Sequence, residues 1–500
     1  MEFKKGRVMK IIKAIIKSKK LLIFYVSFLI YFSCNPSINQ PIQGSTSFEF
    51  IPSSLSGIDF ENRLEESLNT NVLMYEYFYN GGGVAAADFN SDGFIDLYFS
   101  SNMGDNKLYL NLSTDGFSFK DVTQTCGAKG REGPWKTGVS IVDINADGKP
   151  DIYLCYSGAL PEEKRKNQLF INTTAVGSFD VTFEEMSTEY GLDSPAFTTM
   201  AYFFDFDRDG DLDVILLNHN PKNLPNLNEL QTQQLFNVPD FQKGTRLMQN
   251  NNGKFVDITE QSGINGSELS YGLGLGVSDL NNDGWPDFYL SNDYNVPDYL
   301  YINNRNGTFT NKIHDALTHT SHFSMGNDIA DINNDGLPDI LTLDMLPEDN
   351  KRQKLLLSPD NWPKYDLNVR SGFHHQIMRN MLQLNNGDGT FSEIGQIAGI
   401  SNTDWSWASL IADFDNDGHR DIFITNGYLR DFTNLDFINY MNNKISERGR
   451  FSREDVMELI QKMPASDVNN YMFKGTSNIS FKNVTQDWGL KNPSNSNGAI

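Results

Sequence analysis

DFNSDGFID, at residues 88–96, is the stretch that decides the fold, because five more copies of its pattern follow along the 500-residue chain. The other copies read DINADGKPD (143–151), DFDRDGDLD (205–213), DLNNDGWPD (279–287), DINNDGLPD (331–339) and DFDNDGHRD (413–421). Positions 1, 3 and 5 are always Asp or Asn, position 6 is Gly and position 9 is Asp. We call these stretches the first to sixth carboxylate loops. Such internal repetition indicates a repeat architecture with one supersecondary unit per copy.

The spacing within each loop fits an oxygen-coordinated metal ion. Side chains 1, 3 and 5 converge on one point, Gly at position 6 turns the position-7 carbonyl inward, and Asp at position 9 closes the shell. Oxygen ligands in that number suit Ca²⁺, whereas Mg²⁺ demands a stricter octahedron. We therefore predict about six structural calcium ions, and a filled shell argues against a catalytic role. The predicted ligands, with position 7 giving its carbonyl, are Asp88, Asn90, Asp92, Phe94, Asp96, Asp143, Asn145, Asp147, Lys149, Asp151, Asp205, Asp207, Asp209, Asp211, Asp213, Asp279, Asn281, Asp283, Trp285, Asp287, Asp331, Asn333, Asp335, Leu337, Asp339, Asp413, Asp415, Asp417, His419 and Asp421.

The residues around the loops separate two calcium-binding architectures. An EF-hand needs Glu at position 12 and a helix on either side, and neither is present. Short apolar runs flank each loop instead, such as GGVAAADF before the first loop and IDLYFS after it. A hairpin-like segment with an Asn/Gly turn then follows, such as DYLYINNRNGTFT from Asp298. Four strands per repeat, with the metal loop between the first and second, are typical of β-propeller blades.

On these loops and strands the sequence resembles the FG-GAP/VCBS repeat family, whose propellers include that of integrin α subunits. The likeness covers about residues 46–500 and implies an all-β propeller with calcium-binding loops and a few helical insertions. The stretch DFENRLEESLNTNVLMYEYFYNGGGVAAADFNSDG (59–93) resembles the opening of bacterial surface proteins that add a C-terminal ASPIC/UnbV module. That module is not seen in this sequence.

The sequences at the two ends of the chain resemble blade strands, and with the six repeats they predict about seven four-stranded blades, of which the seventh is incomplete. Residues 48–60 (FEFIPSSLSGIDF) resemble the outer strand that ends each repeat, as in FVDITEQSGI from Phe255. The C-terminal SNSNGAI resembles the start of an inner strand, as in NGGGVAA from Asn80. We therefore expect residues 48–500 to be a C-terminally truncated propeller, with a seventh blade begun by the C-terminus and edged by the N-terminus.

The N-terminus carries a targeting pattern. Basic residues crowd the first 20 positions, and an uncharged apolar stretch runs from Leu21 to Ser33. Because about 20 apolar residues are needed to span a bilayer, the pattern predicts a signal peptide over residues 1–34. Ser33-Cys34 resembles a lipoprotein junction at which Cys34 is acylated, and an ordinary signal with an incidental cysteine is the alternative. Residues 35–47 form a polar spacer, and we expect a lipid-anchored outer-membrane protein of a Gram-negative cell envelope.

Charge and cysteine content limit the remaining classes. The formal net charge of -23 argues against a nucleic-acid partner, which would favour a basic surface. Only Cys126 and Cys155 remain beyond Cys34, and two buried free thiols are favoured over a bridge between them.

Three long insertions lie between the second and third strands of their repeats, at 220–243, 344–376 and 427–469. Consecutive connections alternate between the two faces of a blade, so these insertions are expected opposite the carboxylate loops. Residues 442–463 carry helical signals, including a Ser452-x-x-Asp455 start. Long loops on one face of a repeat scaffold usually form its recognition surface. The leading hypothesis is a calcium-stabilised, non-enzymatic cell-surface binding or scaffold module that recognises a protein or glycan there.

The alternative hypothesis is a glycan-active enzyme, a lyase or hydrolase on a propeller scaffold. It needs carboxylates or a Tyr/His pair near the propeller axis on the insertion face, and the nearest candidates are Asp344, Glu348, Asp349 and His374. Packing is favoured over metal binding for His374 and His375, which point to opposite sides of an extended chain. Packing is also favoured over sugar stacking for Trp405 and Trp407.

Overall fold

The computed structural model describes residues 47–112, 117–178, 180–223, 227–294, 296–359, 361–449 and 452–500. The chain divides into Met1–Ser47 and Phe48–Ile500, and the second unit is described below. The predicted signal peptide, Cys34 and the spacer up to residue 46 lie outside the described residues. Within the described ranges, no helix combines the length and the apolar character needed to cross a bilayer.

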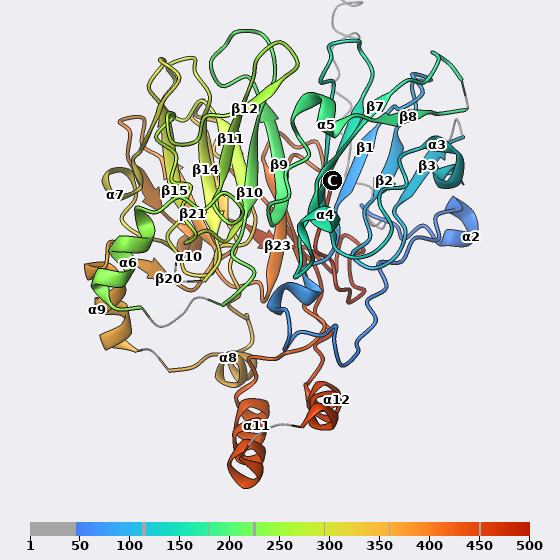
Figure 1. Ribbon diagram of the computed structural model, residues 1–500. Helices are drawn as coiled ribbons and strands as arrows, with labels where there is room; N and C mark the ends of the chain where they lie inside the picture. Colours follow the sequence, from blue (N-terminus) through green and yellow to red (C-terminus); the bar gives the residue numbers. More distant parts are fainter. Residues whose placement is uncertain are drawn as a thin grey trace, which may run out of the picture. The chain divides into compact units, whose positions relative to one another are not determined.

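Six four-stranded antiparallel sheets make up the core of Phe48–Ile500, and in each the strands lie side by side in chain order (Figure 1). From first to sixth, the sheets are β1 (Val84–Ala87), β2 (Asp96–Phe99), β3 (Lys107–Asn111), β4 (Phe119–Asp121); β5 (Lys136–Val142), β6 (Asp151–Tyr156), β7 (Gln168–Asn172), β8 (Phe183–Glu185); β9 (Thr198–Phe204), β10 (Asp213–Asn218), β11 (Arg246–Asn250), β12 (Phe255–Asp257); β13 (Gly272–Ser278), β14 (Asp287–Asn292), β15 (Tyr299–Asn303), β16 (Phe309–Asn311); β18 (Asn327–Ala330), β19 (Asp339–Thr342), β21 (Met381–Asn385), β22 (Phe391–Glu393); and β23 (Ser406–Ala412), β24 (Asp421–Asn426), β25 (Tyr471–Lys474), β26 (Lys482–Asn483). A parallel pair, β17 (Thr320–Ser321) and β20 (Gln376–Ile377), stands apart from them.

Each carboxylate loop joins the first and second strands of its sheet, as the sequence predicted. In the first sheet, for example, Ala87 pairs with Asp96 on either side of the loop. The predicted hairpins supply the third and fourth strands, as where Asn303 pairs with Phe309. The all-β prediction with four-stranded antiparallel repeats is therefore confirmed.

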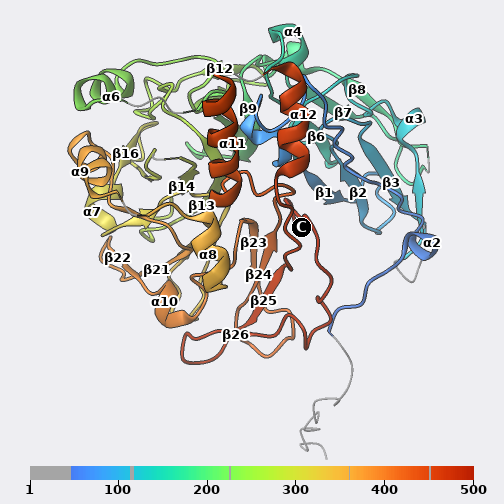
Figure 2. The ribbon, with the colours of Figure 1, turned by 90° about the horizontal axis from the view of Figure 1, so that it is seen from below.

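The first strands of consecutive sheets contact one another, in the order β1, β5, β9, β13, β18 and β23. Seen from below in Figure 2, the sheets follow one another around a centre. Apolar clusters fill the space between neighbouring sheets, such as Ala85 and Tyr98 of the first sheet with Val139 and Ile152 of the second. Successive antiparallel sheets packed face to face in this way are typical of a β-propeller-like fold.

Helices occur at the sheet peripheries and in the insertions. Short ones are α2 (Ser53–Ser56), α3 (Thr123–Cys126), α4 (Glu162–Arg165), α5 (Ser187–Tyr190), α7 (Ile313–Ala316), α10 (Gly395–Ala398) and the 3-10 helix η1 (Glu76–Tyr79). The insertions contain α6 (Glu229–Phe236), α8 (Asn350–Leu356), α9 (Trp362–Arg370), α11 (Leu435–Arg448) and α12 (Arg453–Lys462). In Figure 1, α8, α11 and α12 lie at the lower end, and α6 and α9 lie on the left side.

The third insertion extends one prediction. Helical signals were expected over 442–463, and the structure has two helices in this insertion, of which α11 already begins at Leu435. Gly449 ends α11 with a φ of 74°, which is a left-handed conformation that suits a glycine C-cap. The predicted Ser452 start is confirmed, because Ser452 and Asp455 form a capping box at α12.

Close approach of the first strands requires glycine at Gly326, just before β18. A Cβ added there would lie 2.1 Å from the Trp407 carbonyl oxygen of the next sheet. Gly272 occupies a first strand too, but its added Cβ would lie 3.4 Å from Leu217 Cβ, which is ordinary contact. The spacing between the fifth and sixth sheets thus depends on a missing side chain.

We therefore expect Gly326→Ala to lower the free energy of unfolding by about 1–3 kcal/mol, since backbone must move to relieve the clash. Gly272→Ala is the matched control and should change it by less than about 1 kcal/mol. Chemical denaturation of both variants measures the difference. Equal stability of the two variants would contradict the close packing of β18 against β23.

Candidate metal centres

The aspartate at position 1 organises each carboxylate loop. Its Oδ1 accepts the backbone N–H of position 5 at 2.9–3.1 Å in all six loops. Its Oδ2 accepts the N–H of the position-6 glycine at 2.7–3.1 Å. The position-1 carboxylate therefore holds the loop backbone in a turn through two hydrogen bonds, without any ion.

Two left-handed residues produce the tight turn. The predicted glycine at position 6 has a φ between 83° and 96° in every loop. Position 4 is left-handed as well, with a φ between 55° and 62°, although it is never glycine. The residues there are Ser91, Ala146, Arg208, Asn282, Asn334 and Asn416. The sequence did not reveal this second left-handed position, because four different residue types occupy it and none of them is glycine. A single non-glycine residue in this conformation is strained but tolerated.

Position 9 ties the loop to the sheet. Its Oδ2 accepts the backbone N–H of position 2 at 2.9–3.2 Å. Its Oδ1 accepts an N–H from the end of the third strand at 2.7–2.9 Å. The position-9 side chains are fully buried, and this burial raises the pKa of Asp96 to about 6 and that of Asp213 to about 7 against the effect of the two N–H donors. A cation nearby would offset this effect, because it favours the charged carboxylate.

The remaining oxygens fit a hard divalent cation. In the third loop, Asp205, Asp207 and Asp209 bring carboxylate oxygens within 4.8 Å of one another, and in the sixth loop Asp413, Asp415 and Asp421 do the same. Buried oxygens of Asp207, Asp211 and Asp415 accept no hydrogen bond from the described residues. Buried acceptors without donors are costly, and a coordinated cation would satisfy them. These donor sets suit an ion such as Ca²⁺, and the other ligands named above, including the position-7 carbonyls, stay predictions.

The candidate acids of the insertion face all have structural partners. Asp344 is buried and accepts hydrogen bonds from the Ser321 hydroxyl and from several backbone N–H groups. Glu348 accepts a bond from the Tyr471 hydroxyl at 2.9 Å, and Asp349 caps α8 by accepting from the N–H of Arg352. Each of these three carboxylates therefore has its own structural partner.

The histidine and tryptophan pairs each contact neighbouring side chains. His374 lies against His314 and the Leu317 carbonyl, and burial lowers its pKa to about 4. His375 instead meets the Tyr365 hydroxyl at 2.6 Å. Trp405 and Trp407 are both 8% exposed and stack on Tyr428. Packing or hydrogen bonding was favoured for the histidines and packing for the tryptophans. His374 and both tryptophans are buried, whereas His375 is exposed and makes a hydrogen-bond contact.

The two cysteines are free and buried, as favoured from the sequence. Burial raises the pKa of both Cys126 and Cys155. Their thiols therefore behave as small apolar groups of the sheet-to-sheet clusters.

Sequence reasoning missed an aromatic and acidic cluster built on residues 75–77. Tyr75 and Tyr77 lie against His219, which follows β10, and the Tyr77 hydroxyl donates to Asp293, which follows β14, at 2.9 Å. Tyr428, which follows β24, donates to the Glu76 carbonyl at 2.6 Å. This segment thus contacts the ends of second strands from three sheets.

The cluster is a packed polar network. Burial raises the pKa of Asp293 to about 7 and lowers that of His219 to about 4. His219 Nε2 lies 2.7 Å from the Ser157 hydroxyl, and both residues are fully buried. The aromatic run MYEYFY was the available signal, but its partners lie far away along the chain and no local spacing links them to it.

Three segments of the chain match the FG-GAP-like repeat, at residues 78–154, 279–342 and 367–424. They contain the first, second, fourth, fifth and sixth carboxylate loops. The chain therefore carries FG-GAP-like repeats, as the sequence predicted, while the resemblance to ASPIC/UnbV proteins stays a prediction.

Among proteins of known name, the chain is similar to cartilage acidic protein 1. It is 29% identical to the Homo sapiens protein over 138 residues, which are 27% of this chain and 20% of that protein. It is 30% identical to the Xenopus tropicalis protein over 146 residues, or 28% and 21% of the two chains. The match thus spans about a fifth of the length of these relatives.

Two solved structures show a more distant similarity. A lectin of Agrocybe aegerita, described as recognising non-reducing terminal N-acetylglucosamine, aligns at a TM-score of 0.40 and 14% identity over 81% of this chain and 80% of its own. The Vibrio cholerae biofilm matrix protein Bap1 aligns at a TM-score of 0.24 and 15% identity over 45% and 27%. At these scores neither alignment defines a shared architecture.

Asp147→Ala tests the structural role of the loops. The change removes position 5 of the second loop, whose Oδ1 accepts the Lys149 N–H at 3.0 Å. We expect the free energy of unfolding in Ca²⁺ to fall by about 1–3 kcal/mol, because a ligand and a loop hydrogen bond are lost together. Glu132→Ala removes an exposed acid near the same sheet and should have no such effect. Normal stability in denaturant titrations would overturn the assignment.

Proposed function

We propose that this chain is a calcium-stabilised cell-surface binding module, in which the ions hold the sheets and the insertion face recognises a protein or glycan. The unsatisfied buried oxygens of Asp207 and Asp211 in the third loop support the structural use of calcium. The signal-like pattern of residues 1–34 supports a location outside the cytoplasm. Recognition rests on the insertion face, where aromatic and apolar side chains face solvent.

The observation that carries the binding role is an exposed surface on α6 and α9, which we call the insertion surface. Trp362 of α9 is 70% exposed, and its ring lies 5.4 Å from that of Tyr365. On α6, Leu230 and the nearby Val238 are 64% and 55% exposed. Solvent-exposed aromatic and aliphatic groups gathered in this way are typical of sites that bind a partner.

The insertion surface combines two insertions that contact each other. Arg370 of α9 pairs with Glu229 of α6 at 3.1 Å. Phe236 of α6 and Phe373 after α9 meet edge to face at 5.3 Å. Two insertions separated by more than a hundred residues thus form one continuous surface.

We also propose that the chain supplies two edges of a seventh blade. Residues 48–57 make the same contacts that end the other repeats, which supports this proposal. The backbone N–H of Phe309 donates to the Ser262 carbonyl at the end of the preceding repeat, and that of Phe481 donates to the Ala398 carbonyl. The N–H of Phe48 donates to the Trp488 carbonyl in the same way. Gly57 packs on the Phe119 carbonyl of the first sheet, as Gly127 packs on Phe183 of the second. Residues 48–57 therefore have the contacts of an outer edge between the sixth and first sheets.

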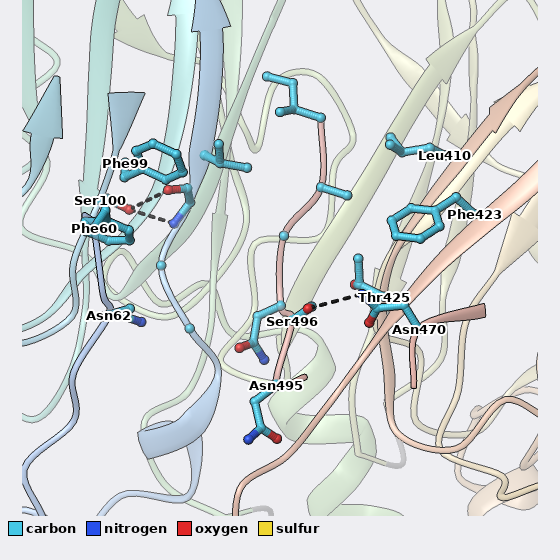
Figure 3. Close-up of a pocket in the computed structure, with 18 of the residues that line it drawn as sticks. Phe60, Asn62, Phe99, Ser100, Leu410, Phe423, Thr425, Asn470, Asn495 and Ser496 are labelled. Atoms are coloured by element: carbon cyan, nitrogen blue, oxygen red, sulfur yellow. Dashed lines mark hydrogen bonds between the residues drawn. The ribbon is translucent and has the colours of Figure 1, made fainter. Parts of the chain in front are cut away.

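The C-terminus supports an inner edge at the same place. Ser496 donates to the carbonyl of Asn426 at the end of β24, as Ser324 donates to that of Asn292 at the end of β14. A cavity of about 780 Å³ lies beside this segment, lined by side chains of the first and sixth sheets. Figure 3 shows Phe60 and Phe99 on one side of it and Leu410 and Phe423 on the other. The middle strands of a seventh blade would occupy this space.

Hydrogen exchange tests the two edges. If they are blade edges, the amides of Phe48 and Ser496 should be protected to within about tenfold of their equivalents Phe481 and Ser324, because their hydrogen bonds are of the same kind. Amide-resolved exchange in Ca²⁺ measures this. Exchange of Phe48 and Ser496 at the rate of an unstructured peptide, with Phe481 and Ser324 protected, would contradict the proposal.

Trp362→Ala tests the insertion surface. Binding in Ca²⁺ is measured on arrays of immobilised glycans and of extracellular proteins, and we expect the variant to lose about tenfold or more of the wild-type signal, because exposed aromatics dominate binding energy. Val176→Ala is the matched control, since Val176 is 79% exposed on a hairpin turn between β7 and β8. Undiminished binding by Trp362→Ala would locate recognition elsewhere, and no binding to either array would contradict the function.

A further inference from the structure

One residue of the third strand distinguishes the six carboxylate loops. It lies on the third strand opposite the position-9 aspartate. Leu97 pairs with Tyr109, and Ile422 pairs with Phe473. The aspartate just before Leu97 or Ile422 therefore faces the residue just after Tyr109 or Phe473. In the first, second, fourth and fifth sheets this residue is aliphatic: Leu110, Ile171, Ile302 and Leu384. In the third and sixth sheets it is polar: Gln249 and Lys474.

The same two loops differ at position 3. Four loops have asparagine there, namely Asn90, Asn145, Asn281 and Asn333, whereas the third and sixth have Asp207 and Asp415. The additional carboxylate therefore occurs wherever the third strand offers a hydrogen-bond donor. A donor placed over an extra negative charge indicates local charge compensation.

Lys474 extends into the sixth loop. Its ammonium contacts the Asp415 carboxylate and lies 2.7 Å from Asp417 Oδ2. The side chain is 31% exposed and passes beside the Trp488 ring, whose centroid is 5.9 Å from Nζ. A full positive charge thus lies among ligands that calcium would need.

Among the described residues, no ammonium or guanidinium group contacts the carboxylates of the third loop. Gln249 donates to Asp207 at 2.7 Å but is uncharged. Arg208 points away, since its guanidinium donates to the Gly284 carbonyl of the next sheet. Its five carboxylates, at every odd position from Asp205 to Asp213, therefore repel one another without compensation.

Arg305 near the fourth loop is a different case. It pairs with Asp283 at 2.7 Å, but it comes from the hairpin turn and is 54% exposed. An exposed pair of this kind is screened by solvent and contributes little. It also contacts one carboxylate, whereas Lys474 contacts two.

We propose that Lys474 is an internal cation of the sixth loop, so that this loop binds Ca²⁺ more weakly than the third and keeps its shape when calcium is scarce. The inference rests on the proposed structural role of calcium. An ion entering the sixth loop must displace the ammonium or share its ligands, and two like charges a few ångströms apart oppose each other. The six sites then form a graded set with the third and sixth loops at its two ends.

Calcium titration calorimetry on the chelator-stripped chain tests the proposal. Wild type should show one site that is weaker than the rest. Lys474→Met keeps an unbranched side chain of nearly the same length and removes its charge, so the weak site should tighten by about tenfold or more. Gln249→Lys places the ammonium in the third loop and should weaken one tight site by a similar factor. Leu384→Met at the same position of the fifth sheet is the control and should match wild type.

Thermal unfolding in chelator gives a second readout. Lys474→Met should lower the apo Tm, because the sixth loop loses its own cation, and Ca²⁺ should restore it to the wild-type value. Isotherms of Lys474→Met and Gln249→Lys that both match wild type, with calcium bound by all, would overturn this inference alone. Absence of calcium binding by wild type and Leu384→Met would instead remove the calcium role and this inference with it. If Lys474→Met does not fold, Gln249→Lys decides.

Discussion

The buried aspartate at position 9 is the constraint on which each sheet depends. Its carboxylate joins three segments, since it accepts one N–H from the start of the loop and one from the end of the third strand while it begins the second strand itself. The link continues between sheets: the Asn172 amide donates to the Phe89 carbonyl of the preceding loop at 2.9 Å, and Asn303 and Asn385 make equivalent contacts. These contacts join the first loop to the second, the third to the fourth and the fourth to the fifth, so a change in one of these loops is expected to affect the neighbouring sheet as well.

The carboxylate loops act on the insertion face through rigid strands. A second strand starts at the position-9 aspartate and ends at residues such as His219 or Asp293, which hold Tyr75 and Tyr77. The segment around η1 is thereby fixed, and the exposed groups of α6 and α9 lie on a scaffold that does not need to reorder. Under the proposed function, calcium and recognition would therefore occupy separate regions, and metal binding would stabilise the surface without contacting a ligand.

Much of the fold could be predicted from the sequence, because the loops and their flanking strands depend on residues close together in the chain. The spacing of Asp, Asn and Gly, the hairpin turns and the Ser452 cap are all local signals, and each is confirmed. The division of the third insertion into two helices at Gly449 was missed, since periodicity alone does not mark a C-cap. Lys474 and the cluster around Tyr77 were missed for another reason: their partners lie far away along the chain, and only the folded chain brings them together.

The central claim is that uncompensated carboxylates make the sheets depend on calcium, and thermal unfolding of the whole chain with and without chelator tests it most directly. The account predicts that excess chelator lowers the Tm by several degrees or more, and that added Ca²⁺ restores it while Mg²⁺ at the same concentration does so less well. A melting curve that is the same in chelator and in Ca²⁺, for protein shown by elemental analysis to contain no bound metal, would contradict it.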